Sequence, residues 1–410
     1  MLDIASLARL GGVKKYGPDE VFFNFGDRGS EMYIILKGRV GVFINSFDGF
    51  PAKLNELRTG DFFGEMSLLE SMPRSATISA LEETVVLVIN ESNFEQVIAQ
   101  QPSLAMRIMK GMSNRLRQQN EELSFLKKGT KPGEEELSDD SSDEPAAASS
   151  GSVAAAPVAV KGPIFPPGHK SYNLVAPSTH ETYLFDKDTE CPVCEKKFPV
   201  RMMRSSKLRL DRVENDMRQR FEEFEPLWYA VWICPHCFYS NFNFEFKQIS
   251  DALKPKIIEH GKTLQGKINL NFSTPRRIDE VFLTYYMAMQ TLQQSPKPEP
   301  GKFAKVWLRL SWLYSDVGDE EMYAMTTKEA YTSFKDAYFN TRRDSSVEQD
   351  QRMNLLLGEL SLRVGEKEEA MKFYRDAIVR KSGGNNVLNK QAEDCMSALK
   401  SVITAEQEGN

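Results

Sequence analysis

Residues 60–80 read GDFFGEMSLLESMPRSATISA, and this stretch decides the fold of the first part of the chain. It combines three groups that a small cyclic phosphate requires. Gly64 lets backbone N–H groups approach an anion closely, Glu65 can accept a hydroxyl hydrogen bond, and Arg74 supplies a planar, permanently charged guanidinium. The stretch therefore predicts a cage for a ribose that is fused to a phosphodiester.

This stretch resembles the phosphate-binding cassette of the cyclic-nucleotide-binding domain family. Phe63-Gly64-Glu65 and Pro73-Arg74-Ser75-Ala76-Thr77 stand at that family's separation without an insertion. The resemblance covers roughly residues 15 to 127 and implies a β-roll that is followed by a helix. Ser67 is a mild departure, because the family usually has alanine at this position.

The resemblance also implies roles for individual residues. Glu65 is expected to hold the ribose 2′-hydroxyl, next to Phe63 and Gly64. Arg74 is expected to hold the cyclic phosphate, together with the backbone N–H and the hydroxyl of Ser75. The structural alternative is an internal salt bridge between Glu65 and Arg74, in a roll that has lost its ligand and serves as a dimerisation scaffold.

Residues 104–127 are expected to form a helix that pairs two chains. Its seam residues recur at alternating spacings of three and four, as in a coiled coil: Met109, Met112, Leu116, Gln119, Leu123 and Leu126. The resemblance to bacterial catabolite activator proteins implies that Gln119 and Asn120 lie beside the purine, one from each subunit. Alternatively, Gln119 only fixes the register of the dimer. Ser75 fits either cyclic AMP or cyclic GMP, and we favour cyclic AMP.

Composition limits the class of protein. The chain has 410 residues, 41% of them hydrophobic, and a net charge of -6, so its length allows roughly two to four domains. It contains no run of about 18 apolar residues, and its first residues lack the long apolar core of a secretory signal. We therefore expect a cytoplasmic protein. Its negative charge offers no general attraction to nucleic acid or to an anionic membrane.

Residues 128–162 differ abruptly in composition from the rest of the chain. The acidic block 134–144 is followed by alanine, serine, proline and glycine, with almost no large apolar side chain. Such a segment cannot bury enough surface to offset its ordering entropy, so we predict a disordered linker. Acidic sequence here also argues against a DNA-binding helix-turn-helix domain, because DNA contact requires basic residues.

Four of the five cysteines form two CPxC pairs, Cys191 with Cys194 and Cys234 with Cys237. Each tight turn can point two thiolates at one metal, so the pairs predict a closed, structural four-sulfur Zn²⁺ site. The 39 intervening residues exceed the usual separation, which is about 15 to 20. A redox dithiol is the alternative, but it calls for one pair beside a βαβ pattern. We expect His236 to be a bystander.

The remaining sequence predicts mostly helices. Between the cysteine pairs we expect a charged helix over 205–226 and a strand over 227–233. Helical patterns follow from about residue 250 and include a helix over 279–293. Two sets of half-motifs resemble the helix pairs of tetratricopeptide repeats. They are Trp307, Leu310, Ser311 and Tyr314 with Ala330, Phe334 and Ala337, and then Leu357 and Gly358 with Gly365, Ala370, Tyr374 and Ala377.

The order of these elements in the second half resembles a bacterial family of uncharacterised function. The expected fold class is therefore α+β multidomain. It comprises an N-terminal β-roll with a dimer helix (1–127), the linker (128–162), a four-cysteine zinc module (163–250) and a tetratricopeptide-like helical domain (251–410).

We expect a non-enzymatic sensor, in which a cyclic nucleotide alters the roll and the dimer helix. The zinc and helical half would pass this change to a protein partner, which binds to its repeats. Alternatively, the repeats form a helical cap that only stabilises the zinc module. The alternative is an enzyme under nucleotide control. The chain contains no phosphate loop, no HExxH and no GxSxG motif, and its four histidines have no recognisable catalytic spacing.

Overall fold

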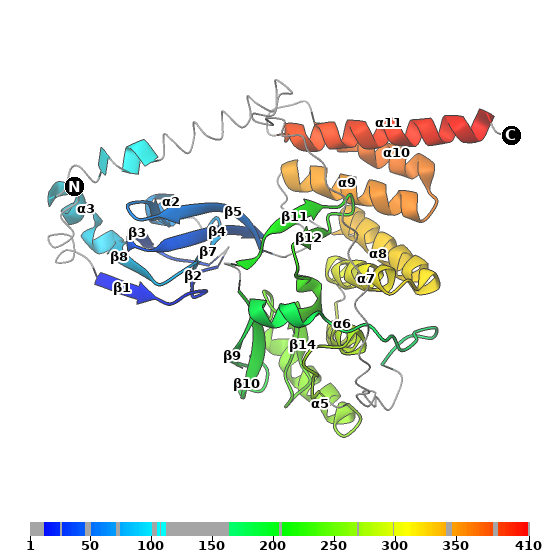
Figure 1. Ribbon diagram of the computed structural model, residues 1–410, viewed down its shortest axis with the longest axis horizontal. Coiled ribbons are helices and arrows are strands. Elements are labelled where there is room, and N and C mark those ends of the chain that lie inside the picture. Colours follow the sequence, from blue (N-terminus) through cyan, green and yellow to red (C-terminus); the bar gives the residue numbers. More distant parts are fainter. Residues whose placement is uncertain are drawn as a thin grey trace, which may run out of the picture.

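Figure 1 shows a computed structural model of the chain. The structure describes residues 12–24, 27–45, 51–70, 74–100, 105–106, 108–111, 164–204, 207–268, 270–297, 299–341, 347–379 and 384–408. Most of the predicted dimer helix and the whole of the predicted linker lie outside the described residues. None of the described helices is long and apolar enough to cross a membrane.

The first half is a β-roll made of two four-stranded antiparallel sheets. The first sheet has the order β1 (Gly12–Tyr16), β8 (Thr84–Asn90), β3 (Glu31–Lys37) and β6 (Phe62–Phe63). The second sheet has the order β2 (Val21–Phe23), β7 (Thr77–Ala80), β4 (Arg39–Asn45) and β5 (Pro51–Arg58). The β-rich fold expected for this half is confirmed.

Alternation along β3 produces two buried layers, because successive side chains of a strand point to opposite faces. Tyr33 and Ile35 belong to the core between the sheets. Met32 and Ile34 face the other way, toward Val97 of helix α3 (Glu91–Gln100). The short helix α2 (Glu65–Glu70) follows β6 directly, so the cassette lies at the end of a strand that this core fixes.

The second half begins with small β-hairpins. After the 3₁₀ turn η1 (Ser178–Tyr183), strands β9 (Leu184–Glu190) and β10 (Lys197–Met203) form the first hairpin. Strands β11 (Leu210–Val213) and β12 (Gln219–Phe221) form the second, and β13 (Val231–Ile233) and β14 (Ser240–Phe242) the third.

The helix predicted over 205–226 is wrong, because this stretch contains the β11–β12 hairpin. Glu214 and Arg218 close its turn through a 2.8 Å backbone hydrogen bond, and Met217 adopts a left-handed φ of 68°. The strand predicted over 227–233 is correct only in its last part. Residues Pro226–Tyr229 form the 3₁₀ helix η3, which starts because proline is favourable at a first helical position and Glu225 caps it.

Helices make up the rest of the second half. They are α5 (Lys254–Leu264), α6 (Ile278–Gln293), α7 (Pro300–Asp316), α8 (Glu320–Asn340), α9 (Val347–Arg363), α10 (Lys367–Asp376) and α11 (Asn386–Glu408), with the 3₁₀ turn η4 (Asp251–Leu253) before them. The helix predicted over 279–293 is confirmed as α6. Helices α7 to α11 stack in chain order in Figure 1, and the predicted half-motifs lie on α7 with α8 and around α9 with α10. The tetratricopeptide assignment itself stays a prediction.

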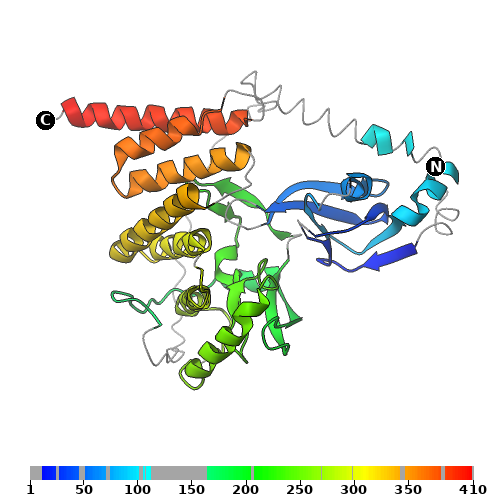
Figure 2. The ribbon, with the colours of Figure 1, turned by 180° about the vertical axis from the view of Figure 1, so that it is seen from behind.

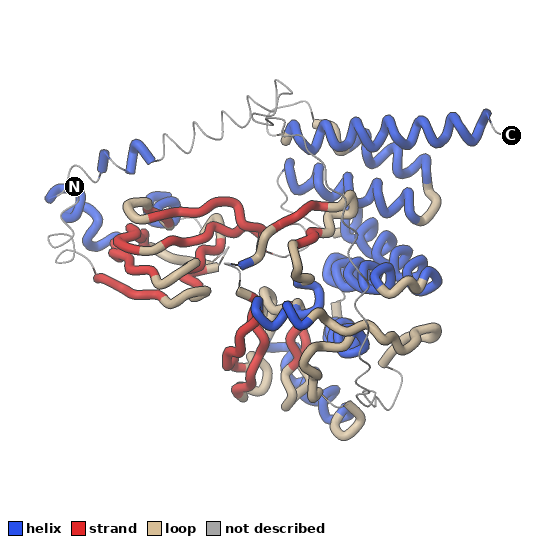
Figure 3. Tube along the Cα trace, in the orientation of Figure 1, coloured by secondary structure: helices blue, strands red, loops and turns tan. Residues whose placement is uncertain are grey.

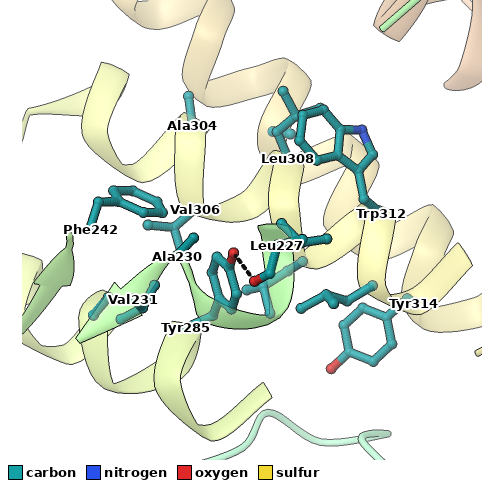
Figure 4. Packing of buried hydrophobic residues seen from close by; sticks show 14 of the residues in the cluster. Leu227, Ala230, Val231, Phe242, Tyr285, Ala304, Val306, Leu308, Trp312 and Tyr314 are labelled. Carbon is teal, nitrogen blue, oxygen red and sulfur yellow. Dashed lines mark hydrogen bonds between the residues drawn. The ribbon is translucent and has the colours of Figure 1, made fainter. Parts of the chain in front are cut away.

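One large core joins η3 to these helices (Figure 4). Leu227 is 1% exposed, and its carbonyl accepts a 2.8 Å hydrogen bond from the Tyr285 hydroxyl of α6. Leu308 and Trp312 of α7 pack in the same cluster. A second, smaller cluster surrounds the four cysteines.

The β-roll lies to one side of the second half in both views of the ribbon (Figures 1 and 2). The tube drawing separates the strand-rich roll from the stack of helices, with the β11–β12 hairpin between them (Figure 3). The two halves contact each other through an ion pair between Arg204 and Asp19.

Candidate functional site

Arg74 lies at the centre of the cassette, three residues before the start of β7, and is 4% exposed. Its Nη1 donates hydrogen bonds to the carbonyl oxygens of Glu31 (2.7 Å) and Gly64 (3.0 Å). Its guanidinium carbon lies 4.0 Å from the centre of the Phe23 ring, which is a favourable cation–π geometry. The Arg74 side chain is therefore buried within the roll rather than exposed to solvent.

This guanidinium has capacity for a further acceptor. Its Nε is buried without a hydrogen-bond partner among the described residues. Burial lowers the pKa of Arg74, while the nearby charges of Tyr33, Glu31, Asp27 and Glu65 oppose that shift. A buried cation gains most from an acceptor that carries negative charge, because charge-assisted hydrogen bonds are about twice as strong as neutral ones. The arrangement therefore fits an anion.

Two glycines enclose the guanidinium. A Cβ at Gly64 would lie 2.5 Å from Nη1 of Arg74, and a Cβ at Gly29 would lie 2.6 Å from its Nη2. Gly64 also has a φ of 79°, which other residues adopt with strain. Side chains at these positions would therefore displace Arg74.

The other predicted cassette residues lie around Arg74. Glu65 is 6% exposed at the start of α2, and Phe63 is buried at the end of β6. The Ser75 side chain is exposed beside Met66, with its hydroxyl 3.6 Å from the sulfur. Pro73 lies outside the described residues. The structure thus brings Phe63, Gly64, Glu65, Arg74 and Ser75 together, and their roles toward a nucleotide stay predictions.

The residues predicted to contact the base, Gln119 and Asn120, lie outside the described residues. Of the predicted dimer helix the structure describes residues 105–106 and 108–111, which are helical, and Ile108 packs on the roll. Met106 and Met109 are 52% and 55% exposed, so an apolar face at the start of this helix points away from the roll.

The four cysteines of the two CPxC pairs form one cluster. All four sulfur atoms lie within 4.8 Å of one another. Cys191 and Cys237 are 3.6 Å apart, as are Cys194 and Cys234. A tetrahedron with Zn–S bonds of about 2.3 Å has edges of about 3.8 Å, so the sulfur positions fit a single metal ion. Thiol hydrogen bonds lower the pKa of Cys191 and raise that of Cys237.

The two turns that carry these cysteines have matching backbones. In each, the N–H of the residue four positions after the first cysteine donates a 2.9 Å hydrogen bond to that cysteine's carbonyl: Glu195 to Cys191, and Phe238 to Cys234. Glu195 and Phe238 both have a φ of 60°. In addition, the Val193 N–H lies 3.4 Å from the Cys191 sulfur. These are the features expected of paired metal-binding knuckles.

Helix α5 closes this site from outside. A Cβ at Gly261 would lie 2.3 Å from the carbonyl oxygen of Cys237, so glycine allows the helix to contact the second knuckle directly. His236 is exposed and is not part of the sulfur cluster. Cys395 lies on α11, far along the chain, and burial raises its thiol pKa.

A groove of about 890 Å³ lies between the tip of the β11–β12 hairpin and helices α9 and α11. Its lining is mainly apolar and includes Val213, Met217, Leu362, Val387 and Val402. Val213, Val387 and Val402 are each about half exposed (52%, 46% and 47%). Sequence patterns did not reveal this groove, because it depends on a hairpin packing against helices that are distant in the chain.

Phe23 is a further residue that sequence reasoning missed. Its ring stacks on Arg74 only because β2 pairs with β7, which follows the cassette directly. Aromatic residues are so common in strands that nothing in the sequence distinguishes Phe23 from a core residue.

Two family models match the chain. Residues 184–401, just over half of it, match the family described as "Uncharacterized protein conserved in bacteria (DUF2225)", and the chain belongs to this family. Residues 13–101 match the model described as "Cyclic nucleotide-binding domain". The two resemblances inferred from the sequence are therefore confirmed.

The relatives of the chain match it over part of its length. A protein of Thermus thermophilus named "Cyclic AMP receptor protein" is 32% identical over 111 residues, covering 27% of this chain and 51% of that protein. A Borreliella burgdorferi protein named "Uncharacterized protein" is 29% identical over 157 residues, covering 34% and 56%. The chain thus spans about half the length of these relatives.

The solved structure of the Thermus thermophilus catabolite activator protein has 29% sequence identity to the chain. It covers 30% of this chain and 58% of its own, with a TM-score of 0.28.

Proposed function

We propose that this protein is a cytoplasmic cyclic-nucleotide sensor, with cyclic AMP favoured over cyclic GMP. The observation that carries this proposal is the buried Arg74. Its guanidinium bonds only main-chain carbonyls among the described residues and keeps a buried Nε without a partner. A cyclic phosphate would supply the missing acceptor, Glu65 would hold the ribose hydroxyl, and Ser75 would add its N–H and hydroxyl. The match of residues 13–101 to the cyclic nucleotide-binding family supports this assignment.

The second half would act as the output of the sensor through binding rather than catalysis. We propose that Cys191, Cys194, Cys234 and Cys237 hold one structural Zn²⁺ ion, because four sulfur ligands leave no position for a reactive water. The helical repeats would bind a protein partner. The groove beside α11 supports this role and suits an apolar peptide segment, because exposed valines line it.

A homodimer through residues 104–127 would complete the nucleotide site with Gln119 and Asn120. The exposed Met106 and Met109 support this pairing. In a dimer these apolar side chains would be buried between two copies of the helix, which contributes roughly 25 cal/mol per Å² of apolar surface.

Thermal unfolding with a panel of cyclic nucleotides tests the proposal. A ligand at 100 times its Kd that binds only the folded state stabilises it by about 2.7 kcal/mol. We expect cyclic AMP to raise the Tm of the intact protein by several degrees, and more than cyclic GMP or cyclic dinucleotides do. If none of these nucleotides changes the Tm and calorimetry detects no binding, the sensor function is refuted.

A further inference from the structure

The β-roll and the second half meet at an ion pair. Nη1 of Arg204 lies 3.6 Å from Oδ2 of Asp19, and the Asp19 side chain is only 4% exposed. Asp19 lies in the tight turn between β1 and β2, with a left-handed φ of 61°. A carboxylate enclosed in this way is screened less by salt than one on an open surface. A small movement of this turn therefore changes the interaction energy of the ion pair.

Two strands connect the Asp19 turn to the cassette. The Asp19 N–H donates a 2.8 Å hydrogen bond to the carbonyl of Ala80, the last residue of β7, and β7 starts three residues after Arg74. On the other side of the turn, β2 ends at Phe23, whose ring stacks on the Arg74 guanidinium at 4.0 Å. A guanidinium that shifts to bind a phosphate would thus act on both strands that hold Asp19.

Arg204 is anchored in the second half by its backbone and by an aromatic ring, and its side chain is 36% exposed. It follows β10 directly, its N–H donates a 2.7 Å hydrogen bond to Tyr183, and its guanidinium lies 5.0 Å from the Phe185 ring centre. Strand β10 pairs with β9, which ends at the residue before Cys191. A single hairpin, β9–β10, therefore connects Arg204 to the first of the two cysteine turns.

We propose that the Asp19–Arg204 ion pair is the joint through which nucleotide binding at Arg74 alters how the β-roll docks on the second half. The inference rests on the proposed sensor function. By thermodynamic reciprocity, a docking contact that responds to the ligand must also change the affinity for that ligand.

A double-mutant cycle in the intact protein tests the joint, with cyclic AMP affinity measured by calorimetry. Asp19→Asn removes the charge and keeps a residue that tolerates a positive φ, and Arg204→Gln removes the partner. We expect each substitution to change the Kd about threefold or more, in the same direction, and the double variant to change it no further than either single one. Matched controls are Glu83→Gln and Arg212→Gln, which remove exposed ion pairs of the roll and of the second half. These should leave the Kd unchanged.

The outcomes separate the two proposals. If the wild-type protein binds no cyclic nucleotide, the sensor function fails. If the wild type binds and each single variant has the wild-type Kd, the joint is refuted while the sensor function stands. The joint is also refuted if the effects of the two substitutions on the Kd add in the double variant. The reversed pair, Asp19→Arg with Arg204→Asp, should restore the wild-type Kd more closely than either reversal alone.

Discussion

Two buried arginines, one in each half of the molecule, differ in their hydrogen-bond partners and in the direction of their pKa shifts. Arg218, which directly precedes β12, has a side chain that is 3% exposed, and it pairs with Asp316 at 2.6 Å and with Glu225 at 2.8 Å. Burial alone would lower the pKa of Arg218, yet these two carboxylates raise it above its ordinary value. Arg74 of the roll is also buried, but among the described residues its guanidinium donates only to main-chain carbonyls, and burial lowers its pKa.

The difference separates a structural charge from one that is available to a ligand. The Arg218 cluster continues through Asp216, which accepts hydrogen bonds from Trp312 (2.7 Å) and Arg363 (2.8 Å). These contacts join the β11–β12 hairpin to α7 and α9. The charged groups of this cluster therefore stabilise the packing of the second half. Arg74 lies instead between two glycines, and among the described residues its guanidinium donates only to main-chain carbonyls; the Nε atoms of both arginines lack a hydrogen-bond partner there, so the contrast lies in the missing carboxylates.

Metal removal should have the largest effect, and only on the second half. Structural zinc contributes about 10 kcal/mol or more of binding free energy in small zinc domains, so stripping it should unfold the knuckle region. We expect about one zinc per chain by elemental analysis. Cys191→Ser combined with Cys194→Ser should lose both the metal and the second-half unfolding transition. Cys395→Ser is the matched control and should retain both the metal and the transition. If the wild-type protein, expressed under reducing and zinc-replete conditions, contains no metal, the proposed zinc site is contradicted.

Replacing the two arginines by methionine tests the comparison itself. Arg218→Met leaves Asp316 and Glu225 without their buried partner and should cost about 3 to 5 kcal/mol of unfolding free energy. Arg74→Met leaves only two carbonyl groups without a donor and should cost about 1 to 2 kcal/mol. Urea unfolding followed by circular dichroism measures both. Equal losses of unfolding free energy would show that Arg74 is as important for the fold as Arg218. Arg212→Met is the control, because Arg212 is exposed.

The fold of the first half could be predicted in detail because the cassette is local. Its glycine, glutamate and arginine lie within about ten positions, and strand β6 and helix α2 place the glycine and the glutamate. Arg74 is also held by residues distant in the sequence, Glu31 and Phe23. The four-cysteine cluster was predictable for the same reason, since each turn fixes its own pair of sulfurs.

The hairpin at 205–226 was not predictable in this way. Its charged residues match a solvated helix, and their true partners, Trp312, Asp316 and Arg363, lie about a hundred residues or more further along the chain. Local patterns carry no information about such pairing, which is why tertiary contacts override propensity here. The stacking of Phe23 on Arg74 escaped prediction because it also depends on strand pairing.

A smaller, pH-dependent effect should mark the second half. His169 bonds the Tyr314 hydroxyl at 2.8 Å, and burial lowers the pKa of His169 from 6.5 to about 4. The unfolded chain takes up this proton first, so the stabilisation is fully present above pH 6.5 and is lost as the pH falls toward 4. The loss is about 2 to 3 kcal/mol at one residue. His169→Gln should flatten the stability profile in that range.

The central claim is that Arg74 is held for a ligand rather than for the fold. Calorimetric titration of cyclic AMP into the intact wild-type protein and into Arg74→Ala tests it most directly. The account predicts saturable binding to the wild type and an affinity weakened well over tenfold in the variant, since truncating one partner of a buried charge pair costs about 2 to 5 kcal/mol. Binding of equal affinity to both proteins would contradict it.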